Sequence, residues 1–205
     1  MNQNDFVVGM DVDGVLRNWV QTILLQVNFL YETRIFNNHI TGYDLVPIIQ
    51  EQIPGFDQKA LNGIHKRCAE TGKLAQASAY KDALNLFYII HEAGFPIRLV
   101  TCQPDFARES FYQWIKAFHL AERIAGIDFM EPGHKADAKV QVLIDDDPRV
   151  IVEAAKRNIP AVLWKRRWNR DWRYEGNDIP ENMIRYTVVP KQALRFIEDW
   201  EDELS

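Results

Sequence analysis

The sequence of 205 residues has few cysteines, no long apolar run and no excess of basic residues. Its two cysteines, Cys68 and Cys102, are too few for a disulfide framework. No stretch approaches the roughly 18 consecutive apolar residues of a membrane span, and the polar segment 1–5 has no secretory character. The formal net charge of -5 argues against bulk attraction to nucleic acid or anionic membranes. These absences predict a cytoplasmic protein with neither partner.

The composition and the apolar pattern indicate the fold class. A hydrophobic content of 47% is enough for one core of ordinary size. Past residue 71, strand-like and helix-like stretches alternate, with strands expected at 97–101, 127–130, 140–144 and 160–164 and helices at 80–93, 106–118, 149–157 and 190–204. This alternation predicts an α/β protein with a Rossmann-like, mostly parallel sheet and helices on both faces.

An insertion is expected near the N-terminus. Segments 20–31 and 56–70 have helical patterns with no convincing strand between them. We therefore expect a small helical cap at 19–78, inserted into a catalytic core made of 1–18 and 79–205. Such a cap rises from the end of the first strand and can close over substrate and exclude water. The alternative is that these helices simply pack on the sheet.

Two carboxylates directly follow the first apolar run. Residues 6–10 have the pattern of a strand buried on both faces, and Asp11 and Asp13 come next, before a turn at Gly14. Ligands of open parallel sheets bind beyond the carboxyl ends of the strands, and alternate residues of an extended segment point the same way. Both carboxylates can therefore approach one phosphoryl group. A pair of solvated turn aspartates is the alternative.

Polar side chains also follow two later strands. Thr101 ends one strand, and the acidic run 145–147 ends another. Both have structural explanations, because Asp147 before Pro148 is suited to cap a helix and a threonine hydroxyl can satisfy a backbone group. Asp105, after a proline, is likewise expected to cap the helix over 106–118.

The acidic residues together predict a cation. Asp145 and Asp146 would repel Asp11 and Asp13 at the same sheet edge unless a positive charge lies among them. Oxygen ligands that leave positions open for water and phosphate suit Mg²⁺. We therefore expect a magnesium site at this edge.

The ordered set made of 11–15, Thr101, Lys135 and 145–146 resembles the haloacid dehalogenase superfamily of aspartate-nucleophile phosphatases. It looks most like the 5'-nucleotidases of the deoxyribonucleotidase type. Three details carry that likeness: an early Asp-Gly-Val-Leu, Lys135 shortly before Leu-Ile-Asp-Asp-x-Pro, and a strand end leading to Trp-Asn-Arg at 168–170. The resemblance implies a Mg²⁺-dependent phosphomonoesterase that acts on nucleoside 5'-monophosphates.

The resemblance also implies roles for individual residues. Asp11 would be the nucleophile that forms an aspartyl phosphate, and Asp13 would be the general acid and base, with a raised pKa. Thr101 would hydrogen-bond a phosphoryl oxygen, and Lys135 would balance charge on the nucleophile. Asp11, the backbone carbonyl of Asp13 and Asp146 would hold Mg²⁺.

Substrate contacts are expected on both sides of the catalytic residues. Cys102 and Gln103 follow Thr101 and are candidate substrate-binding residues. They depart from the family, which often has a small residue or serine near these positions. Trp19, just past the first turn, should lie near the entrance, although it could equally be a core residue. The Phe and Tyr residues of the cap, and Trp164 or Trp168, are further candidates for an aromatic wall against a nucleobase.

Several assignments have rivals within the sequence. Lys139 competes with Lys135 for the basic role, and Asp145 or Asp147 could share the metal with Asp146. A Cys-x5-Arg spacing between Cys102 and Arg108 resembles a tyrosine-phosphatase loop with a thiolate nucleophile. Pro104 removes a backbone donor from that loop and no glycine loosens it, which disfavours the thiolate alternative.

The aromatic and basic stretch 164–174 leaves further alternatives open. It could bind single-stranded nucleic acid, but an active-site rim or an oligomer contact fits the acidic chain better. A phosphatase of nucleic-acid ends, a sugar phosphatase and a non-catalytic binding protein of the same fold remain alternatives. A small phosphomonoester is the expected partner, and the sequence leaves open whether the chain forms a homo-oligomer.

Overall fold

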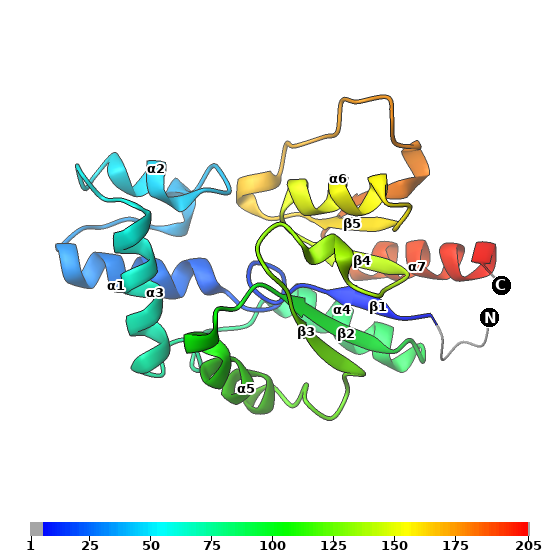
Figure 1. Cartoon of the computed structure of the whole chain (residues 1–205), viewed down its shortest axis with the longest axis horizontal. Helices are drawn as coiled ribbons and strands as arrows, with labels where there is room; N and C mark the ends of the chain where they lie inside the picture. Colours follow the sequence, from blue (N-terminus) through cyan, green and yellow to red (C-terminus); the bar gives the residue numbers. More distant parts are fainter. Residues whose placement is uncertain (1–5, 205) are drawn as a thin grey trace.

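The computed structural model describes residues 6–204 and has a parallel sheet at its centre (Figure 1). Six strands lie in the order β3-β2-β1-β4-β5-β6, and each neighbouring pair is parallel. The strands are β1 Val8–Met10, β2 Ile97–Thr101, β3 Gly126–Phe129, β4 Val142–Asp145, β5 Ala161–Trp164 and β6 Ile184–Thr187. The predicted parallel sheet is confirmed. Residues 1–5, which belong to the expected core segment and to the polar segment behind the cytoplasmic prediction, lie outside the described residues.

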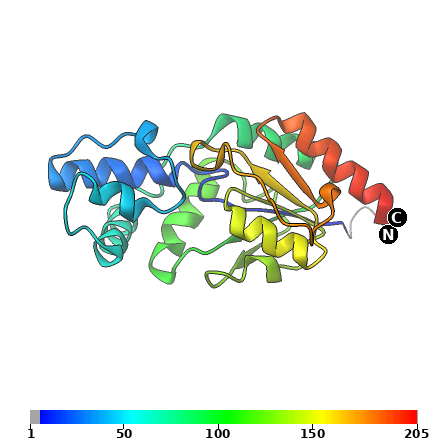
Figure 2. The same ribbon diagram turned by 90° about the horizontal axis from the view of Figure 1, so that it is seen from above.

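Helices cover both faces of this sheet, as predicted. α4 (Lys81–Glu92), α5 (Arg108–Ala117) and α7 (Pro190–Leu204) share one apolar cluster with the sheet, and α6 (Pro148–Lys156) packs on the other face. Figure 2 shows α7 and α6 on opposite sides of the strands. The chain therefore forms a three-layered α/β structure with a buried sheet.

Burial of both faces explains why the central strands are continuous apolar runs. In β4, Val142 and Ile144 enter the cluster with α4 and α7, whereas Leu143 enters the cluster with α6. In β1, Gly9 lies so close to its neighbours that an added Cβ would sit 3.0 Å from a methyl group of Val140. A larger residue there would push β1 away from the segment that precedes β4.

Three helices are inserted between β1 and α4. They are α1 (Trp19–Tyr31), α2 (Leu45–Gln50) and α3 (Gln58–Glu70), and they lie beyond the carboxyl ends of the strands (Figure 1). Their inward side chains form an apolar cluster of their own. Short 3-10 turns complete the chain at Asn37–His39, Asp105–Ala107, Lys135–Asp137, Arg167–Asn169 and Glu181–Met183.

Several local predictions are confirmed and three need correction. Asp147 caps α6 with Pro148 in its first turn, as predicted. Asp105 does not cap α5, because a 3-10 turn precedes that helix and Asp105 pairs with Arg108 instead, at 2.8 Å. Two elements, α2 and β6, were not predicted. β6 is a short edge strand with an exposed Arg185, so its sequence lacks the apolar run of a buried strand.

Among the described residues, no helix combines the length and the apolar character that crossing a membrane requires.

The sheet core should be sensitive to loss of volume at α4. Phe87 is completely buried against the sheet, so Phe87→Ala should lower the free energy of unfolding by about 3–5 kcal/mol in urea denaturation. Phe29 on α1 is 71% exposed, and Phe29→Ala should change it by no more than about 0.5 kcal/mol. Equal effects of the two substitutions would contradict the burial of Phe87 and the exposure of Phe29.

Candidate active site

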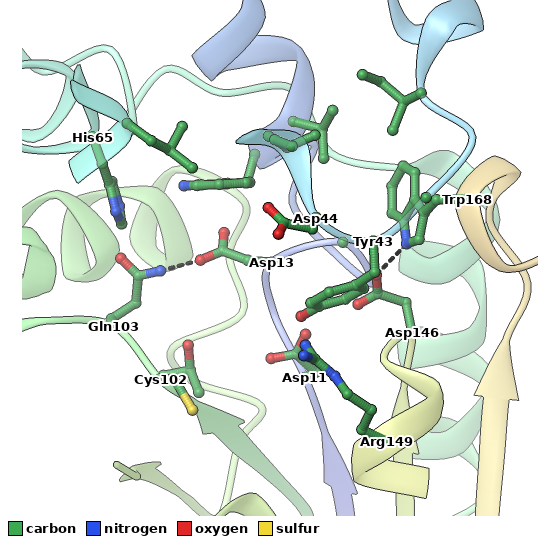
Figure 3. A pocket seen from close by; sticks show the side chains of 18 of the residues that line it. Asp11, Asp13, Tyr43, Asp44, His65, Cys102, Gln103, Asp146, Arg149 and Trp168 are labelled. Carbon is green, nitrogen blue, oxygen red and sulfur yellow. Dashed lines mark hydrogen bonds between the residues drawn. The ribbon is translucent and has the colours of Figure 1, made fainter. Parts of the chain in front are cut away.

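A cavity of about 420 Å³ lies between the sheet and the inserted helices. In the sheet, β2 and β3 lie on one side of β1, and β4, β5 and β6, which come later in the chain, lie on its other side. Loops therefore diverge where β1 and β4 end, and such a switch point opens a crevice beyond the strand ends. Side chains that follow β1, β2 and β4 form the floor of the cavity (Figure 3).

A buried lysine occupies the centre of this floor. The Lys135 Nζ lies 2.7 Å from Asp11 Oδ1 and 2.9 Å from Asp145 Oδ2. It comes from the 3-10 turn just before β4, which places its ammonium group between the ends of β1 and β4. Lys139, the rival from the sequence, is exposed and does not line the cavity.

Burial dominates the electrostatics of these groups. It raises the pKa of Asp11 well above its usual range, and the nearby Lys135 ammonium opposes that rise. Burial, with the neighbouring Asp145 charge, raises the pKa of Asp146 to about 7. Burial alone would lower the pKa of Lys135, but the Asp11 and Asp145 carboxylates raise it well above its ordinary value. The single ammonium group of Lys135 thus lies beside three buried carboxylates, so an additional cation would stabilise their charged forms.

The acidic side chains are close enough to share a cation. One carboxylate oxygen from each of Asp11, Asp145 and Asp146 lies within 4.8 Å of the others. The Asp146 Oδ1 is buried and has no hydrogen-bond partner among the described residues. Gly14 makes room beside it, because a Cβ at that position would collide with the Asp146 carboxylate. The donor set consists of oxygens only, which fits Mg²⁺.

The three consecutive aspartates after β4 have different surroundings. Asp145 accepts bonds from Lys135 and, at 2.8 Å, from the backbone N–H of Asp147. Asp147 turns to α6, where it accepts from the backbone and the guanidinium of Arg149. Only Asp146 keeps a free buried carboxylate oxygen in this run. The geometry therefore favours Asp146 over its neighbours as a metal ligand.

Asp13 is held by a buried arginine that was not predicted from the sequence. Arg17 Nε lies 2.6 Å from Asp13 Oδ1, and its Nη2 lies 3.0 Å from Oδ2. Gln103 also donates to Asp13 Oδ2. The Arg17 side chain is completely buried, with the rings of Phe111 and Trp114 at 6.0 and 5.7 Å. In the sequence, the one indication of this role is that Arg17 stands beside apolar residues, four positions after Asp13.

The end of β2 contributes the predicted polar side chains. Thr101, Cys102 and Gln103 all line the cavity. Burial raises the pKa of the Cys102 thiol to about 11, and its Sγ contacts the Glu131 carbonyl oxygen at 3.7 Å. Arg108 does not line the cavity. The thiolate alternative therefore has neither an ionised thiol at neutral pH nor an arginine cradle.

The inserted helices provide the outer wall. Trp19 lines the cavity and meets the His65 ring edge-on, with ring centroids 5.5 Å apart. Burial lowers the pKa of His65, and its Nε2 has no partner among the described residues. Tyr43 comes from the loop before α2, and its ring faces the Arg149 guanidinium, whose Cζ lies 4.7 Å from the ring centroid (Figure 3). Tyr43 belongs to the Phe and Tyr residues of the cap that were candidates for the aromatic wall, whereas His65 was not predicted, because no sequence pattern around it distinguishes it.

The stretch 164–174 divides between the core and the cavity. Trp164 is completely buried in the sheet core and cannot form a wall against substrate, which corrects that expectation. Trp168 lines the cavity and donates to Asp146. Lys165 donates to the carbonyls of Asn169 and Trp172 at 2.9 and 2.8 Å, so part of the basic charge is used within the protein.

Comparison with known proteins supports the assignment of the fold. No protein-family profile and no curated protein matches the sequence. Among solved structures, the HAD-hydrolase YfnB of Bacillus subtilis, bound to magnesium, is 12% identical with a TM-score of 0.63, over 95% of this chain and 99% of that chain. The haloacid dehalogenase-like hydrolase SP0104 of Streptococcus pneumoniae is 14% identical with a TM-score of 0.62, over 96% and 99%. The Protein Tyrosine Kinase A of Mycobacterium tuberculosis is 15% identical with a TM-score of 0.64, over 93% and 97%.

The chain thus has a haloacid dehalogenase-like α/β fold, which the sequence resemblance implied. At identities of 12–15%, these likenesses establish the fold alone. A kinase and hydrolases share it, so the reaction has to be argued from the site itself.

The surroundings of Cys102 give a pH-dependent prediction. Because burial raises its pKa to about 11, the thiol stays neutral at pH 7.5 and gains reactivity only in strongly alkaline solution. Iodoacetamide should alkylate Cys102 at least about 100-fold more slowly in the folded chain than in urea at this pH. Peptide mass spectrometry separates it from Cys68. Equal rates in both states would show an accessible, ionised thiol and revive the thiolate alternative.

Proposed function

We propose that this protein is a Mg²⁺-dependent phosphomonoesterase that acts through an aspartyl phosphate on Asp11. The observation that carries the proposal is the buried Lys135 ammonium, bonded to both Asp11 and Asp145 beside the unpartnered oxygen of Asp146. This arrangement fixes the Asp11 carboxylate at the edge of the sheet. The Lys135 ammonium can attract an anionic phosphate there, and the unpartnered Asp146 oxygen can bind a cation. Nothing in the thiolate alternative explains it.

The proposed reaction has two displacements at phosphorus. An Asp11 carboxylate oxygen attacks, the bond from phosphorus to the leaving oxygen breaks, and that oxygen takes a proton from Asp13. Asp13 then removes a proton from water, whose oxygen attacks the aspartyl phosphate and releases phosphate and Asp11. Arg17 and Gln103 donate hydrogen bonds to Asp13 and fix its carboxylate at the cavity wall.

Magnesium would be held by Asp11, Asp146 and the backbone carbonyl of Asp13. When bound, it would neutralise phosphate charge so that an anionic nucleophile can approach an anionic substrate. The magnesium bound to YfnB, a protein with the same fold, is consistent with this choice of ion. Thr101 would hydrogen-bond a phosphoryl oxygen from the end of β2, where its side chain lines the cavity.

We further propose that 19–78 acts as a cap over a core made of 1–18 and 79–205. The inserted helices support this division by packing around an apolar cluster separate from those of the sheet. They also cover the cavity with Trp19, Tyr43 and His65. Specificity would then depend on the cap, and chemistry on the strand ends.

Nucleoside 5'-monophosphates are the proposed substrates, including deoxy forms. The cavity of about 420 Å³ lies in the range of small-molecule sites, and Trp19 and Trp168 offer aromatic surface for a base. Stacking on such a residue contributes roughly 1–3 kcal/mol per base where it has been measured. Cys102 and Gln103 would contact the phosphate end.

Removal of the nucleophile should abolish activity and leave the fold intact. Asp11→Asn keeps the shape of the side chain but removes the attacking carboxylate and a metal ligand, so release of phosphate should cease. Asp13→Asn should lower kcat by about 10²- to 10⁴-fold for loss of acid and base assistance. Phosphate release with Mg²⁺ and with EDTA measures both effects, and circular dichroism checks the fold.

Cys102→Ser serves as the matched control, since it removes only the thiol of a cavity residue and keeps a small polar side chain beside the phosphate end. This variant should retain substantial activity. Normal turnover by Asp11→Asn, or loss of turnover by Cys102→Ser alone, would refute the aspartate mechanism.

The substrate class can be tested with one panel. Nucleoside 5'-monophosphates should have higher kcat/KM than 3'-monophosphates, hexose phosphates and a 3'-phosphorylated oligonucleotide. Hexose phosphates carry no base, and 3'-phosphates hold the base in a different position relative to phosphorus. Measurements at two salt concentrations identify binding along a nucleic-acid backbone, which weakens steeply with salt. A preference for hexose phosphates, or a salt-sensitive preference for the oligonucleotide, would reject the nucleotide and keep the phosphatase chemistry.

A further inference from the structure

The loop after β5, residues 165–170, contacts the ends of two other strands. Its Arg166 donates to the backbone carbonyls of Gly14 and Val15, at 2.7 and 2.6 Å. The same guanidinium pairs with Asp82 at 2.7 Å and lies 3.8 Å from the ring centroid of Tyr80. Arg166 therefore connects the turn that follows Asp11 and Asp13 to the β5 loop through hydrogen bonds.

Two further residues of this loop hold the acidic run after β4. Asn169 is buried and donates to the backbone carbonyls of Asp146 and Trp164, at 2.7 and 3.1 Å. The Trp168 indole N–H donates to Asp146 Oδ2 at 2.7 Å (Figure 3). Both the backbone and the carboxylate of Asp146 are thus held by one loop, from the side away from Asp13.

Trp168 also contacts the inserted helices, because its ring packs against their apolar cluster. The indole consequently has two separable contacts: an apolar one to the cap and a hydrogen bond to Asp146. A hydrogen bond to one oxygen of a carboxylate restricts its rotation and leaves the other oxygen as the available ligand atom. In Asp146 that other oxygen is Oδ1, which is buried and has no partner among the described residues.

We propose that Trp168 is a positioning residue for the cation site: its indole N–H holds Asp146 Oδ2 so that Oδ1 is presented as a ligand beside Asp11. Residues that hydrogen-bond metal ligands commonly set the orientation of those ligands. The proposal rests on the cation site of the proposed function and not on its phosphatase activity. It gives the indole N–H of Trp168 a role at Asp146, which is separate from the aromatic surface that the ring offers to the cavity.

Two variants separate the hydrogen bond from the packing. Trp168→Phe keeps an aromatic ring against the cap and loses the N–H, whereas Trp168→Leu loses both the N–H and the ring. Isothermal titration of the purified full chain with Mg²⁺ alone measures affinity without any substrate. Both variants should bind Mg²⁺ about 10- to 100-fold more weakly than the wild type, and by similar factors, because the missing N–H is what they share.

Trp172→Phe is the matched control, since Trp172 lies a few residues further on and packs on Tyr186 instead, with ring centroids 6.3 Å apart. Its Mg²⁺ affinity should equal that of the wild type. Asp146→Asn should lose most of the binding, because it weakens the ligand itself. Melting temperatures in EDTA show whether each variant folds, and the rise in melting temperature on adding Mg²⁺ gives a second measure of binding.

The outcomes distinguish this inference from the proposed function. Trp168→Phe binding Mg²⁺ within about twofold of the wild type would overturn the positioning role, as would a wild type that does not bind Mg²⁺. A large loss in Trp168→Leu with none in Trp168→Phe would assign the effect to packing and also overturn it. Trp168-dependent binding of Mg²⁺ in a chain that hydrolyses no phosphomonoester would uphold the inference and refute the phosphatase.

Discussion

The arrangement of this protein depends on one buried ammonium group. Lys135 lies between Asp11 and Asp145, and its two short contacts join the ends of β1 and β4 at the centre of the sheet. Burying these carboxylates without a cation would be costly, because desolvation and mutual repulsion both oppose their charged forms. The lysine offsets part of this desolvation and repulsion, and the unpartnered oxygen of Asp146 is positioned to contact a further cation.

The rest of the site is held from outside the acidic cluster. Arg17 is completely buried and donates hydrogen bonds to Asp13. In the β5 loop, Arg166 donates to the backbone of the turn after β1. Asp13 and the turn that follows it are therefore fixed in part by two arginines that do not line the cavity. This division matches a general feature of reactive sites, where surrounding hydrogen bonds set the geometry of the reacting groups.

The inserted helices complete the cavity without joining the sheet core. Their apolar cluster is separate, and they contribute aromatic and polar side chains such as Trp19 and His65 to its outer wall. The contact between Trp168 and that cluster links the wall to Asp146. The strand ends and the inserted helices thus meet at one cavity, although they belong to different parts of the chain.

The sequence by itself determined the parallel sheet, most of its helices and the residues at the ends of β1, β2 and β4, because buried strands are apolar runs and the polar residues after them stand out. It did not reveal β6, whose exposed Arg185 interrupts the pattern, or α2. Only the tertiary structure decided between Lys135 and Lys139, separated the surroundings of Asp145, Asp146 and Asp147, and placed Trp164 in the core and Trp168 at the cavity. Those distinctions arise from contacts between residues far apart in the chain, which no local pattern records.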